Sequence, residues 1–415
     1  MTVGQRLRHK AAELGFAKCG IARSQSLDAV SKERFLRWIG EGFHGEMGYM
    51  ARQSEKRLDP SEVLAGSKSV ISVLVNYFTS PQHSDDALTG AVSRYAWGRD
   101  YHLTVKEKLR ALNAFLSSLV TSHSSIFYVD TGPLLDKWWA QRAGLGWIGK
   151  NSNLITPEIG SWVFVGEILT TVEFTGSDYD ASFEHPSAAF KREDGIQYGK
   201  TPSIETQDAE TAPKRTLCGS CRRCLEVCPT GAIVAPFVVD SRKCISYLTI
   251  ELRGPIPREF RRGIGNRIFG CDDCQDVCPW NRFAAVSYEQ AFHPDEGNLT
   301  PSLIELLSLT QEEFNRRFKN SAIRRARYSG FLRNVAVALG NSHRPEAVPA
   351  LESALQHVEA LVRQHAAWAL GEIGNPEAIQ ALRSHLAQEN NADVRKEIEA
   401  ALQSAEKLNG DGHQR

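Results

Sequence analysis

This sequence has no net charge and no long hydrophobic run. Its 415 residues contain 49 Lys and Arg against 49 Asp and Glu. A balanced chain has no overall attraction to nucleic acid, so any such partner must be recognised by local basic patches. The longest apolar run, residues 70–78, is far shorter than the roughly 20 residues that a helix needs to cross a bilayer. The sequence therefore predicts a protein without membrane spans.

A cleavable leader is not expected either. Residues 1–16 are charged and amphipathic, whereas a secretory signal has a basic start, an apolar centre and a cleavage site. We therefore expect a soluble, cytoplasmic protein whose thiols stay reduced. The length allows about two to four domains with hydrophobic cores of their own.

Cysteine is concentrated in one stretch and almost missing elsewhere. Of the nine cysteines, all but Cys19 lie between Cys218 and Cys278. They form Cys-x-x-Cys-x-x-Cys-x-x-x-Cys-Pro from Cys218, a lone Cys244, and Cys-x-x-Cys-x-x-x-Cys-Pro from Cys271. The first run has the spacing of bacterial ferredoxins, in which three thiolates hold one [4Fe–4S] cluster and the fourth binds the other. Cys19 is expected to be a small buried strand residue.

The ferredoxin spacing predicts which cysteines share a cluster. One cluster would be held by Cys218, Cys221, Cys224 and Cys278. The second would be held by Cys228, Cys244, Cys271 and Cys274. Structural zinc and a disulfide framework are the alternatives, but zinc does not explain a third cysteine at the same interval followed by Cys-Pro, and disulfides are unexpected without a secretory signal. We therefore predict two [4Fe–4S] clusters.

Hydrophobic periodicity predicts a multidomain α+β protein. Its N-terminal α/β domain has helices expected at 3–14, 101–121 and 134–143, and buried strands expected at 69–78, 125–130 and 161–169. The predicted parts are an α/β domain over 1–175, a polar surface insertion over 176–215, a ferredoxin-like domain over 216–295, a basic helical connector over 296–327 and helical repeats over 328–405. The insertion has few apolar anchors and leaves room for a contact with a partner.

The repeats are visible in the sequence itself. The segment that begins at Leu339 recurs from Leu370, a period of 31 residues. Each copy predicts a helix, a glycine turn, a proline at the start of the next helix, and a second helix, as in HEAT repeats. A small helical cap over the rest of the chain is the alternative.

A glycine-rich loop follows the helix expected at 134–143. Its sequence, Gly144-Leu-Gly-Trp-Ile-Gly149-Lys-Asn, fits G-x-G-x-x-G. A dinucleotide or phosphate loop must leave a strand and begin a helix, but here a helix precedes the glycines and a strand or loop follows. The alternatives are a helix-ending turn, or glycines that let the backbone approach a bulky ligand. In the second case the polar contacts would come from Lys150, Asn151, Ser152 and Asn153.

Asp130 ends the strand expected at 125–130 and precedes Thr-Gly-Pro. Its carboxylate is expected at the carboxyl end of a sheet, where open α/β folds bind ligands. Apolar and aromatic neighbours raise the pKa of a carboxyl group, which can then donate a proton near neutral pH. A turn residue that caps the next helix is the alternative, and the residues alone do not decide between the two.

Two basic runs follow the first cysteine motif. Residues 314–333 carry seven Lys or Arg and no acid, and residues 253–267 carry five arginines against one glutamate. Such runs are usually solvated faces. The aromatic residues of the first run would also fit phosphate contact combined with base stacking. These aromatic residues are Phe314, Phe318, Tyr328 and Phe331.

Several motifs in a fixed order resemble the epoxyqueuosine reductase family. They are Gly45-Glu-Met-Gly-Tyr49-Met50, Arg57-Leu-Asp-Pro60, Tyr95-Ala-Trp-Gly-Arg-Asp100-Tyr101-His102, Asp130-Thr-Gly-Pro133, the glycine-rich loop and the cysteine block. The resemblance covers most of residues 1–175 and 216–402. It implies a cobalamin-dependent iron–sulfur oxidoreductase, akin to the reductive dehalogenases, that reduces epoxyqueuosine to queuosine at the anticodon wobble position of tRNA.

The resemblance also implies site residues and partners. It makes Asp130 the proton donor, and the cofactor-binding residues would be Arg57, Tyr95, Asp130, Gly149, Lys150, Asn151, Ser152 and Asn153. The clusters would pass electrons from an external one-electron donor to cobalt. Corrinoid modules with a cobalt-binding histidine carry Asp-x-His-x-x-Gly, and the glycine is missing after His102, so base-off cobalamin is expected. We expect a monomer. A corrinoid reductase of a small molecule is the alternative, and it would leave the basic runs and the repeats without a task.

Overall fold

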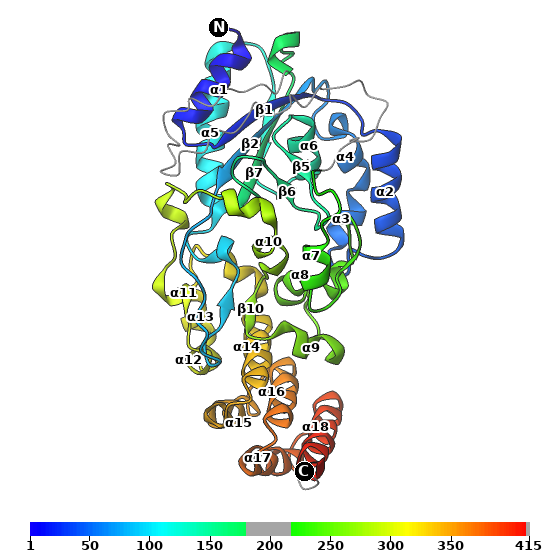
Figure 1. Cartoon of the computed structure of the whole chain (residues 1–415), viewed down its shortest axis with the longest axis vertical. Helices are drawn as coiled ribbons and strands as arrows, with labels where there is room; N and C mark the ends of the chain where they lie inside the picture. The colour runs from blue at the N-terminus through cyan, green and yellow to red at the C-terminus, as the bar shows by residue number, and fades with distance from the viewer. Residues whose placement is uncertain (180–216, 412–415) are drawn as a thin grey trace.

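The computed structural model describes residues 1–179 and 217–411 (Figure 1). The insertion predicted at 176–215 falls mostly outside these residues. In Figure 1 the N-terminal sheet domain, the cysteine-rich domain and the helical repeats follow one another along the long axis, and the C-terminus lies at the end farthest from the sheet.

A four-stranded antiparallel sheet forms the centre of the N-terminal domain. Its strands, in spatial order, are β1 (Lys18–Arg23), β2 (Ser69–Asn76), β7 (Val163–Thr170) and β4 (Ser125–Tyr128). The three strands predicted by apolar runs are therefore confirmed to within a few residues. All eight residues of β2 are buried, as expected for a central strand with both faces covered.

Helices cover both faces of this sheet. Helices α1 (Val3–Glu13) and α5 (Tyr101–Leu119) pack on one face, and α6 (Asp136–Arg142) packs on the other. The predicted helices are confirmed, and Gly15, with φ of +82°, follows the end of α1. Cys19 is a buried residue of β1, as predicted. Three further helices follow β1 in the chain: α2 (Ala29–Gly40), α3 (Gly48–Arg52) and α4 (Ser54–Leu58).

The cysteine-rich domain is built from short helices and strands. They are α7 (Arg223–Val227), β8 (Ile233–Ala235), β9 (Val238–Val239), α8 (Ile245–Ile250), α9 (Arg258–Ile264), β10 (Arg267–Phe269) and α10 (Asp273–Asp276). Strand β10 pairs in parallel with β3 (Ala91–Val92), which belongs to the N-terminal part of the chain. Just after β3, Ser93 and the backbone NH of Arg94 donate hydrogen bonds to Asp272. The N-terminal domain and the cysteine-rich domain are thus joined by backbone pairing between β3 and β10.

The C-terminal helices stack as repeats. They are α14 (Tyr328–Ser342), α15 (Val348–Ala354), α16 (Ala360–Ile373), α17 (Pro376–Leu386) and α18 (Ala392–Asp411), preceded by α11 (Glu296–Leu299), α12 (Leu303–Leu307) and α13 (Gln311–Arg317). The repeated glycines allow close helix packing, because a Cβ on Gly340 would lie 2.7 Å from the backbone of Ala369, and one on Gly371 would lie 2.9 Å from that of Ala401. No helix within residues 1–179 and 217–411 is long and apolar enough to cross a membrane.

Three of the four aromatic residues proposed for base stacking are buried in the core, so the prediction is wrong for them, and Tyr328 is half-buried. Phe314, Phe318 and Phe331 are at most 2% exposed and pack on one another. The Tyr328 hydroxyl donates to the carbonyl of Leu309. Their spacing reflects helix packing against the connector and not a surface that stacks bases.

The arginines of the 253–267 run also have partners within the protein. Arg258 and Arg261 lie 2.7 and 2.8 Å from Glu397, and Arg262 lies 2.7 Å from Glu372. Both acids belong to the repeats. These ion pairs fix the repeats to α9. The side chains of Arg258 and Arg262 are still 45% and 70% exposed, so a phosphate contact by this run stays a prediction.

Candidate active site and cluster sites

Asp130 lies in a turn just beyond β4. Its φ of +44° is in the left-handed region, which is uncommon for a residue other than glycine. Its side chain is 47% exposed. Tyr101 donates its hydroxyl hydrogen to Oδ2, and His102 Nε2 lies 2.9 Å from Oδ1. The predicted apolar surroundings are therefore wrong, because the carboxyl group is half-exposed and hydrogen-bonded.

The sheet explains this position differently from the sequence prediction. Its four strands are antiparallel, so the rule for the carboxyl ends of parallel strands does not apply. The helix-capping alternative is not supported either, since α6 has Leu135 at its N-cap and no side-chain cap. The carboxylate of Asp130 is held instead by the first turn of α5.

His102 links Asp130 to a second carboxylate. Its Nδ1 lies 2.7 Å from Oδ1 of Asp100, the N-cap residue of α5. Burial lowers the pKa of His102, but the hydrogen bonds to Asp100 and Asp130 outweigh it and raise the pKa to about 9. The imidazole is therefore charged at neutral pH, and both ring nitrogens are occupied by carboxylates. This arrangement agrees with the expectation of no histidine ligand, which stays a prediction.

Aromatic rings pack against Tyr101, the residue that donates a hydrogen bond to Asp130. Tyr101 stacks on Phe164 with ring centres 4.1 Å apart, and Tyr95 meets Tyr101 edge-on at 6.0 Å. Burial raises the pKa of Tyr101 well above its usual value, and the charge of Asp130 raises it further. Tyr101 therefore stays a neutral hydrogen-bond donor. The structure thus brings Tyr95, a predicted site residue, next to Asp130.

Arg57 holds the turn that carries Asp130. Its Nη1 donates to the carbonyls of Leu134 at 3.0 Å and Gly132 at 3.4 Å, while its buried Nε has no partner among the described residues. A Cβ on Gly132 would lie 2.3 Å from the Tyr128 ring, so only glycine fits there. Arg57 therefore positions the turn, and its contact with a cofactor stays a prediction.

Two carboxyl groups, Asp136 in the first turn of α6 and Glu167 on β7, act on each other's pKa, and Ser72 Oγ donates to Glu167 at 3.3 Å. Asp136 Oδ1 and Glu167 Oε2 are buried and have no hydrogen-bond partner among the described residues, so a proton on one carboxyl group would be needed to bridge the two. Burial, and next the charge of Asp130, raise the pKa of Asp136 to about 7, and burial raises that of Glu167 well above its usual value. Burial therefore favours a proton on this pair.

The glycine-rich loop is a β-hairpin. Gly144, with φ of +74°, ends the turn after α6, and β5 (Trp147–Ile148) pairs with β6 (Leu154–Ile155). A strand and not a helix follows the glycines, so the segment lacks the context that a nucleotide loop needs, as predicted. Gly144 ends the turn after α6, as the first alternative predicts, and a close approach of this backbone to a bulky ligand stays a prediction.

The polar residues of this hairpin contact the cysteine block. Lys150 Nζ donates to the carbonyls of Gly219 at 2.7 Å and Cys221 at 2.9 Å. Asn151 Nδ2 donates to the carbonyl of Cys274 at 3.1 Å, and Asn153 Nδ2 lies 4.0 Å from its sulfur. These residues connect the N-terminal domain to the cluster sites, and their contact with a corrinoid stays a prediction.

The cysteines form two sets. The outer cysteine set, Cys218, Cys221, Cys224 and Cys278, lines one cavity of about 240 Å³. The cavity includes Cys278 from the second run, as the ferredoxin spacing predicts, and four thiols around such a space fit a [4Fe–4S] cluster.

The inner cysteine set is Cys228, Cys244, Cys271 and Cys274. Their thiols are electrostatic neighbours, Cys228 with Cys244 and Cys244 with both Cys271 and Cys274. Burial raises the pKa of Cys271 and Cys274, so they need the positive charge of a bound cluster to ionise. The backbone NH of Ala232 donates to the Cys228 sulfur at 3.3 Å, a bond of the type that tunes cluster potential.

Lys137 is exposed and lies within electrostatic reach of both Asp130 and the inner cysteine set. Its Nζ donates to the carbonyl of Ser152 at 2.9 Å and to Asn153 Oδ1 at 3.0 Å. Asn153 in turn lies 4.0 Å from the Cys274 sulfur. The inner cysteine set is therefore linked through Asn153 to a lysine that interacts with the charge of Asp130.

Sequence reasoning did not assign roles to Tyr101, His102, Asp136 or Glu167. Tyr101 and His102 had a signal, because they follow the N-cap Asp100 at the exposed start of a helix. Glu167 also had one, since it interrupts the apolar run of β7.

Comparisons with known proteins agree with this arrangement. Residues 57–131 match a family described as "Epoxyqueuosine reductase QueG, DUF1730", residues 217–281 match a 4Fe-4S double cluster binding domain, and residues 321–403 match HEAT repeats. The HEAT prediction and the two-cluster prediction are thereby confirmed.

Two curated relatives share the name epoxyqueuosine reductase. The epoxyqueuosine reductase of Escherichia coli K12 is 38% identical over 373 residues, covering 88% of each chain. That of Leadbetterella byssophila is 40% identical over 326 residues, covering 79% of this chain and 95% of the relative.

Solved structures give the same result. An epoxyqueuosine reductase crystallised with an epoxyqueuosine-modified tRNA stem loop superimposes with a TM-score of 0.81 at 30% identity, over 97% of this chain and 98% of the other. A Bacillus subtilis epoxyqueuosine reductase, with a catalytic aspartate loop swung out of its active site, gives a TM-score of 0.80 at 29% identity, over 96% and 98%. The chain therefore belongs to the epoxyqueuosine reductase family of oxidoreductases.

Proposed function

We propose that this chain reduces epoxyqueuosine to queuosine in tRNA, with electrons supplied through two [4Fe–4S] clusters. The observation that carries the proposal is the hydrogen-bonded group of Asp130, Tyr101 and His102 next to the inner cysteine set, in a chain of this family. Removing the epoxide oxygen as water and leaving an alkene consumes two electrons and two protons. The site offers a proton-bearing group and an electron path side by side.

Cobalamin is the proposed partner of this site. The residues that would hold it are Tyr95, Arg57 and the hairpin residues 149–153, and the unpartnered Nε of Arg57 offers a free donor. The half-exposed carboxyl of Asp130 adjoins the same region. Bound cobalamin would supply a metal that accumulates two electrons from clusters that each carry one.

We propose that the protein itself delivers protons and keeps the Asp130 carboxyl group in position. Asp130 delivers a proton to the departing oxygen, and this proton comes from His102, which is charged at neutral pH and lies 2.9 Å from the Asp130 carboxylate. Tyr101 and Arg57 keep the carboxyl group and its turn in place. The swung-out aspartate loop of the B. subtilis relative supports a turn that opens for substrate.

The proposed tRNA contact uses exposed charges of the 314–333 run. Its basic side chains that remain exposed without an ion pair in the described part of the chain are Arg316, Arg317, Lys319, Arg324 and Arg327. Arg325 nearby pairs with Glu251 at 2.8 Å, and its charge reaches Asp130. Phosphate contacts of this kind position a nucleic acid without reading its sequence. The reaction is proposed to occur in the cytoplasm, with one chain as the working unit.

The test is anaerobic turnover of an epoxyqueuosine-modified tRNA stem loop. The wild-type protein, reduced with dithionite, is assayed with and without added cobalamin, and the nucleosides are identified by mass spectrometry. We expect queuosine only with cobalamin. Conversion of a small organohalide, with the stem loop left unchanged, would instead indicate a small-molecule reductase.

A further inference from the structure

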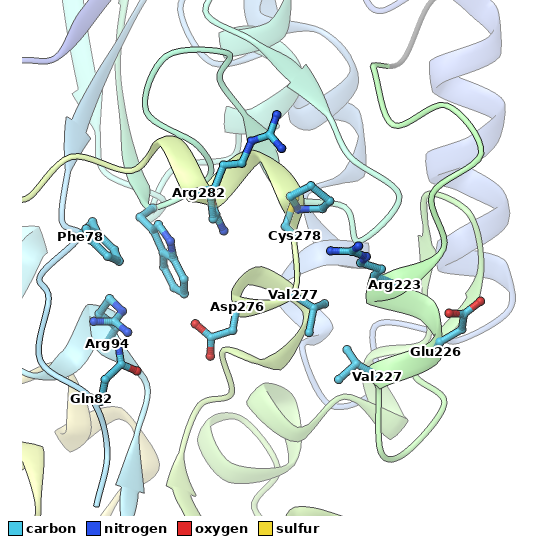
Figure 2. A pocket seen from close by; sticks show the side chains of 13 residues that line it. Phe78, Gln82, Arg94, Arg223, Glu226, Val227, Asp276, Val277, Cys278 and Arg282 are labelled. Atoms are coloured by element: carbon cyan, nitrogen blue, oxygen red, sulfur yellow. The ribbon is translucent and has the colours of Figure 1, made fainter. Parts of the chain in front are cut away.

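A cavity of about 750 Å³ opens beside the outer cysteine set (Figure 2). Cys278 and Pro279 form part of its wall, and Arg223 and Arg282 line both this cavity and the one that the outer cysteine set surrounds. We propose that this cavity is the docking site of the external electron donor, an acidic one-electron carrier protein. The inference rests on the proposed function, in which the clusters need such a donor.

Three arginines and two acids, Glu226 and Asp276, line the cavity, so its lining has an excess of one positive charge. Figure 2 shows Arg223 and Arg282 on two sides of Cys278 and Arg94 across the cavity. Arg223 and Arg282 are exposed and form no ion pair within the described residues, whereas the acid Glu226 lies 3.8 Å from Arg222. Two unpaired guanidinium groups near a cluster ligand attract an acidic carrier and orient it.

The wall of the cavity also provides apolar contact area. Val227 and Val277 lie between the charged residues in Figure 2, and Phe78 and Trp162 pack around Arg94, whose guanidinium lies 5.0 and 5.1 Å from their ring centres. Arg94 is 4% exposed, and its Nε has no partner among the described residues. A small apolar centre inside a charged rim is typical of transient electron-transfer interfaces, which bury less than about 1,200 Å².

The position relative to the chemistry favours this side. Asn153 lies 4.0 Å from the Cys274 sulfur of the inner cysteine set and binds Lys137, which interacts with the charge of Asp130. That side must receive the tRNA. A protein donor is therefore expected at the outer cysteine set, where it does not compete with the substrate. Each encounter oxidises the carrier by one electron and reduces the outer cluster by one electron, so two encounters supply one turnover.

The experiment compares a protein donor with a small reductant. Clusters of the holoenzyme are reduced either by a pre-reduced acidic [2Fe–2S] ferredoxin or by dithionite, and the loss of visible iron–sulfur absorbance is followed by stopped flow. For Arg282→Glu, alone and with Arg223→Glu, we expect reduction by ferredoxin to slow at least about tenfold. Reduction by dithionite and dithionite-supported turnover should stay at the wild-type level.

Arg110→Glu is the matched control, because Arg110 is exposed on α5 and has no ion pair among the described residues. It should leave both rates unchanged. Iron content and circular dichroism verify folding and cluster loading, and Arg282→Gln serves as the milder variant. In wild type, raising the salt concentration should slow reduction by ferredoxin and not reduction by dithionite.

Two outcomes would overturn the proposal. Equal rates of ferredoxin reduction in wild type and the double variant would refute the docking site. Loss of turnover with dithionite, at normal cluster content, would assign the arginines to tRNA binding instead. Failure of the proposed function is distinguishable, because the wild type would then convert no stem loop with either reductant.

Discussion

The two cysteine sets come from the same kind of motif and lie in different surroundings. The outer cysteine set surrounds a cavity of about 240 Å³ beside exposed arginines. The inner cysteine set is held against the N-terminal domain by Asn151 and Asn153, and Asn153 also binds Lys137. The difference is the basis of the proposed electron path, which enters at the outer cysteine set and ends at the inner one.

The residues proposed to hold protons near Asp130 are also separate from the cysteine sets. Protons are held by His102 and by the Asp136–Glu167 pair, none of which touches a cysteine sulfur in the described structure. The proposed paths for electrons and for protons therefore use different residues. Substitutions should affect one path and leave the other intact.

Loss of an inner ligand should have the largest effect. Cys274→Ala removes a thiolate from the set next to Asp130, and we expect turnover to fall at least about a hundredfold with either ferredoxin or dithionite. Cys218→Ala in the outer cysteine set should lower ferredoxin-supported turnover by more than dithionite-supported turnover. Iron content and stem-loop conversion are the measurements. Wild-type turnover by Cys274→Ala would contradict the assignment of an inner cluster.

Loss of His102 should have an intermediate effect and act on protons alone. The pKa of His102 is raised to about 9, so the charge is complete at neutral pH and is lost as the pH rises through about 9. We expect His102→Gln to lower turnover about tenfold and to remove the decline of the wild type near pH 9. The rate of cluster reduction should not change.

A suitable control for this variant is His9→Gln, because the His9 side chain is 65% exposed on α1. The same pKa shift predicts stability. The charged His102 stabilises the fold fully below pH 6.5, and this contribution is lost as the pH rises through about 9. A pH profile for His102→Gln identical to that of the wild type would show that the histidine is not the proton store.

The buried carboxyl pair should affect stability more than chemistry. Glu167→Ala removes the acceptor of the Ser72 hydroxyl and the carboxyl group that can share a proton with Asp136, and we expect a loss of about 1–3 kcal/mol. Glu167→Gln can donate its amide hydrogen to Asp136 and should cost less. Urea unfolding at several pH values measures both effects.

The pH dependence has a defined sign. The pKa of Asp136 is raised to about 7, so the stability that its bound proton contributes is present below its unfolded pKa and is lost as the pH rises through about 7. The stability of the wild type should therefore fall as the pH rises from about 4 to about 7, and that of Glu167→Gln should fall less. Equal slopes for the two proteins would argue against a shared proton.

Features with a fixed local spacing could be predicted from the sequence. The ferredoxin motif identified the outer set, including Cys278 some fifty residues from the rest, because the crossing of the fourth thiolate is a property of the motif. The repeated Leu-Gly pairs at 339 and 370 predicted stacked helices, because the glycines are needed for close packing. The position of Asp130 at a strand end was likewise local.

Features that depend on distant partners could not be predicted. Arg261 reads as a surface charge until Glu397 is placed 2.8 Å from it, and Phe331 reads as a stacking residue until the connector buries it. The partners Asp136 and Glu167 lie on different elements, so neither signals the other. Charge and aromatic patterns alone do not distinguish a nucleic-acid surface from an interface inside the protein.

The most direct test of separate electron and proton paths is a single-turnover comparison of wild type with Asp130→Asn. Both proteins, loaded with cobalamin and fully reduced, are mixed anaerobically with excess epoxyqueuosine stem loop, and queuosine is quantified by mass spectrometry. We predict equal rates of prior cluster reduction and a fall in queuosine formation of at least about a hundredfold in the variant. Queuosine formation by Asp130→Asn at the wild-type rate would contradict the account.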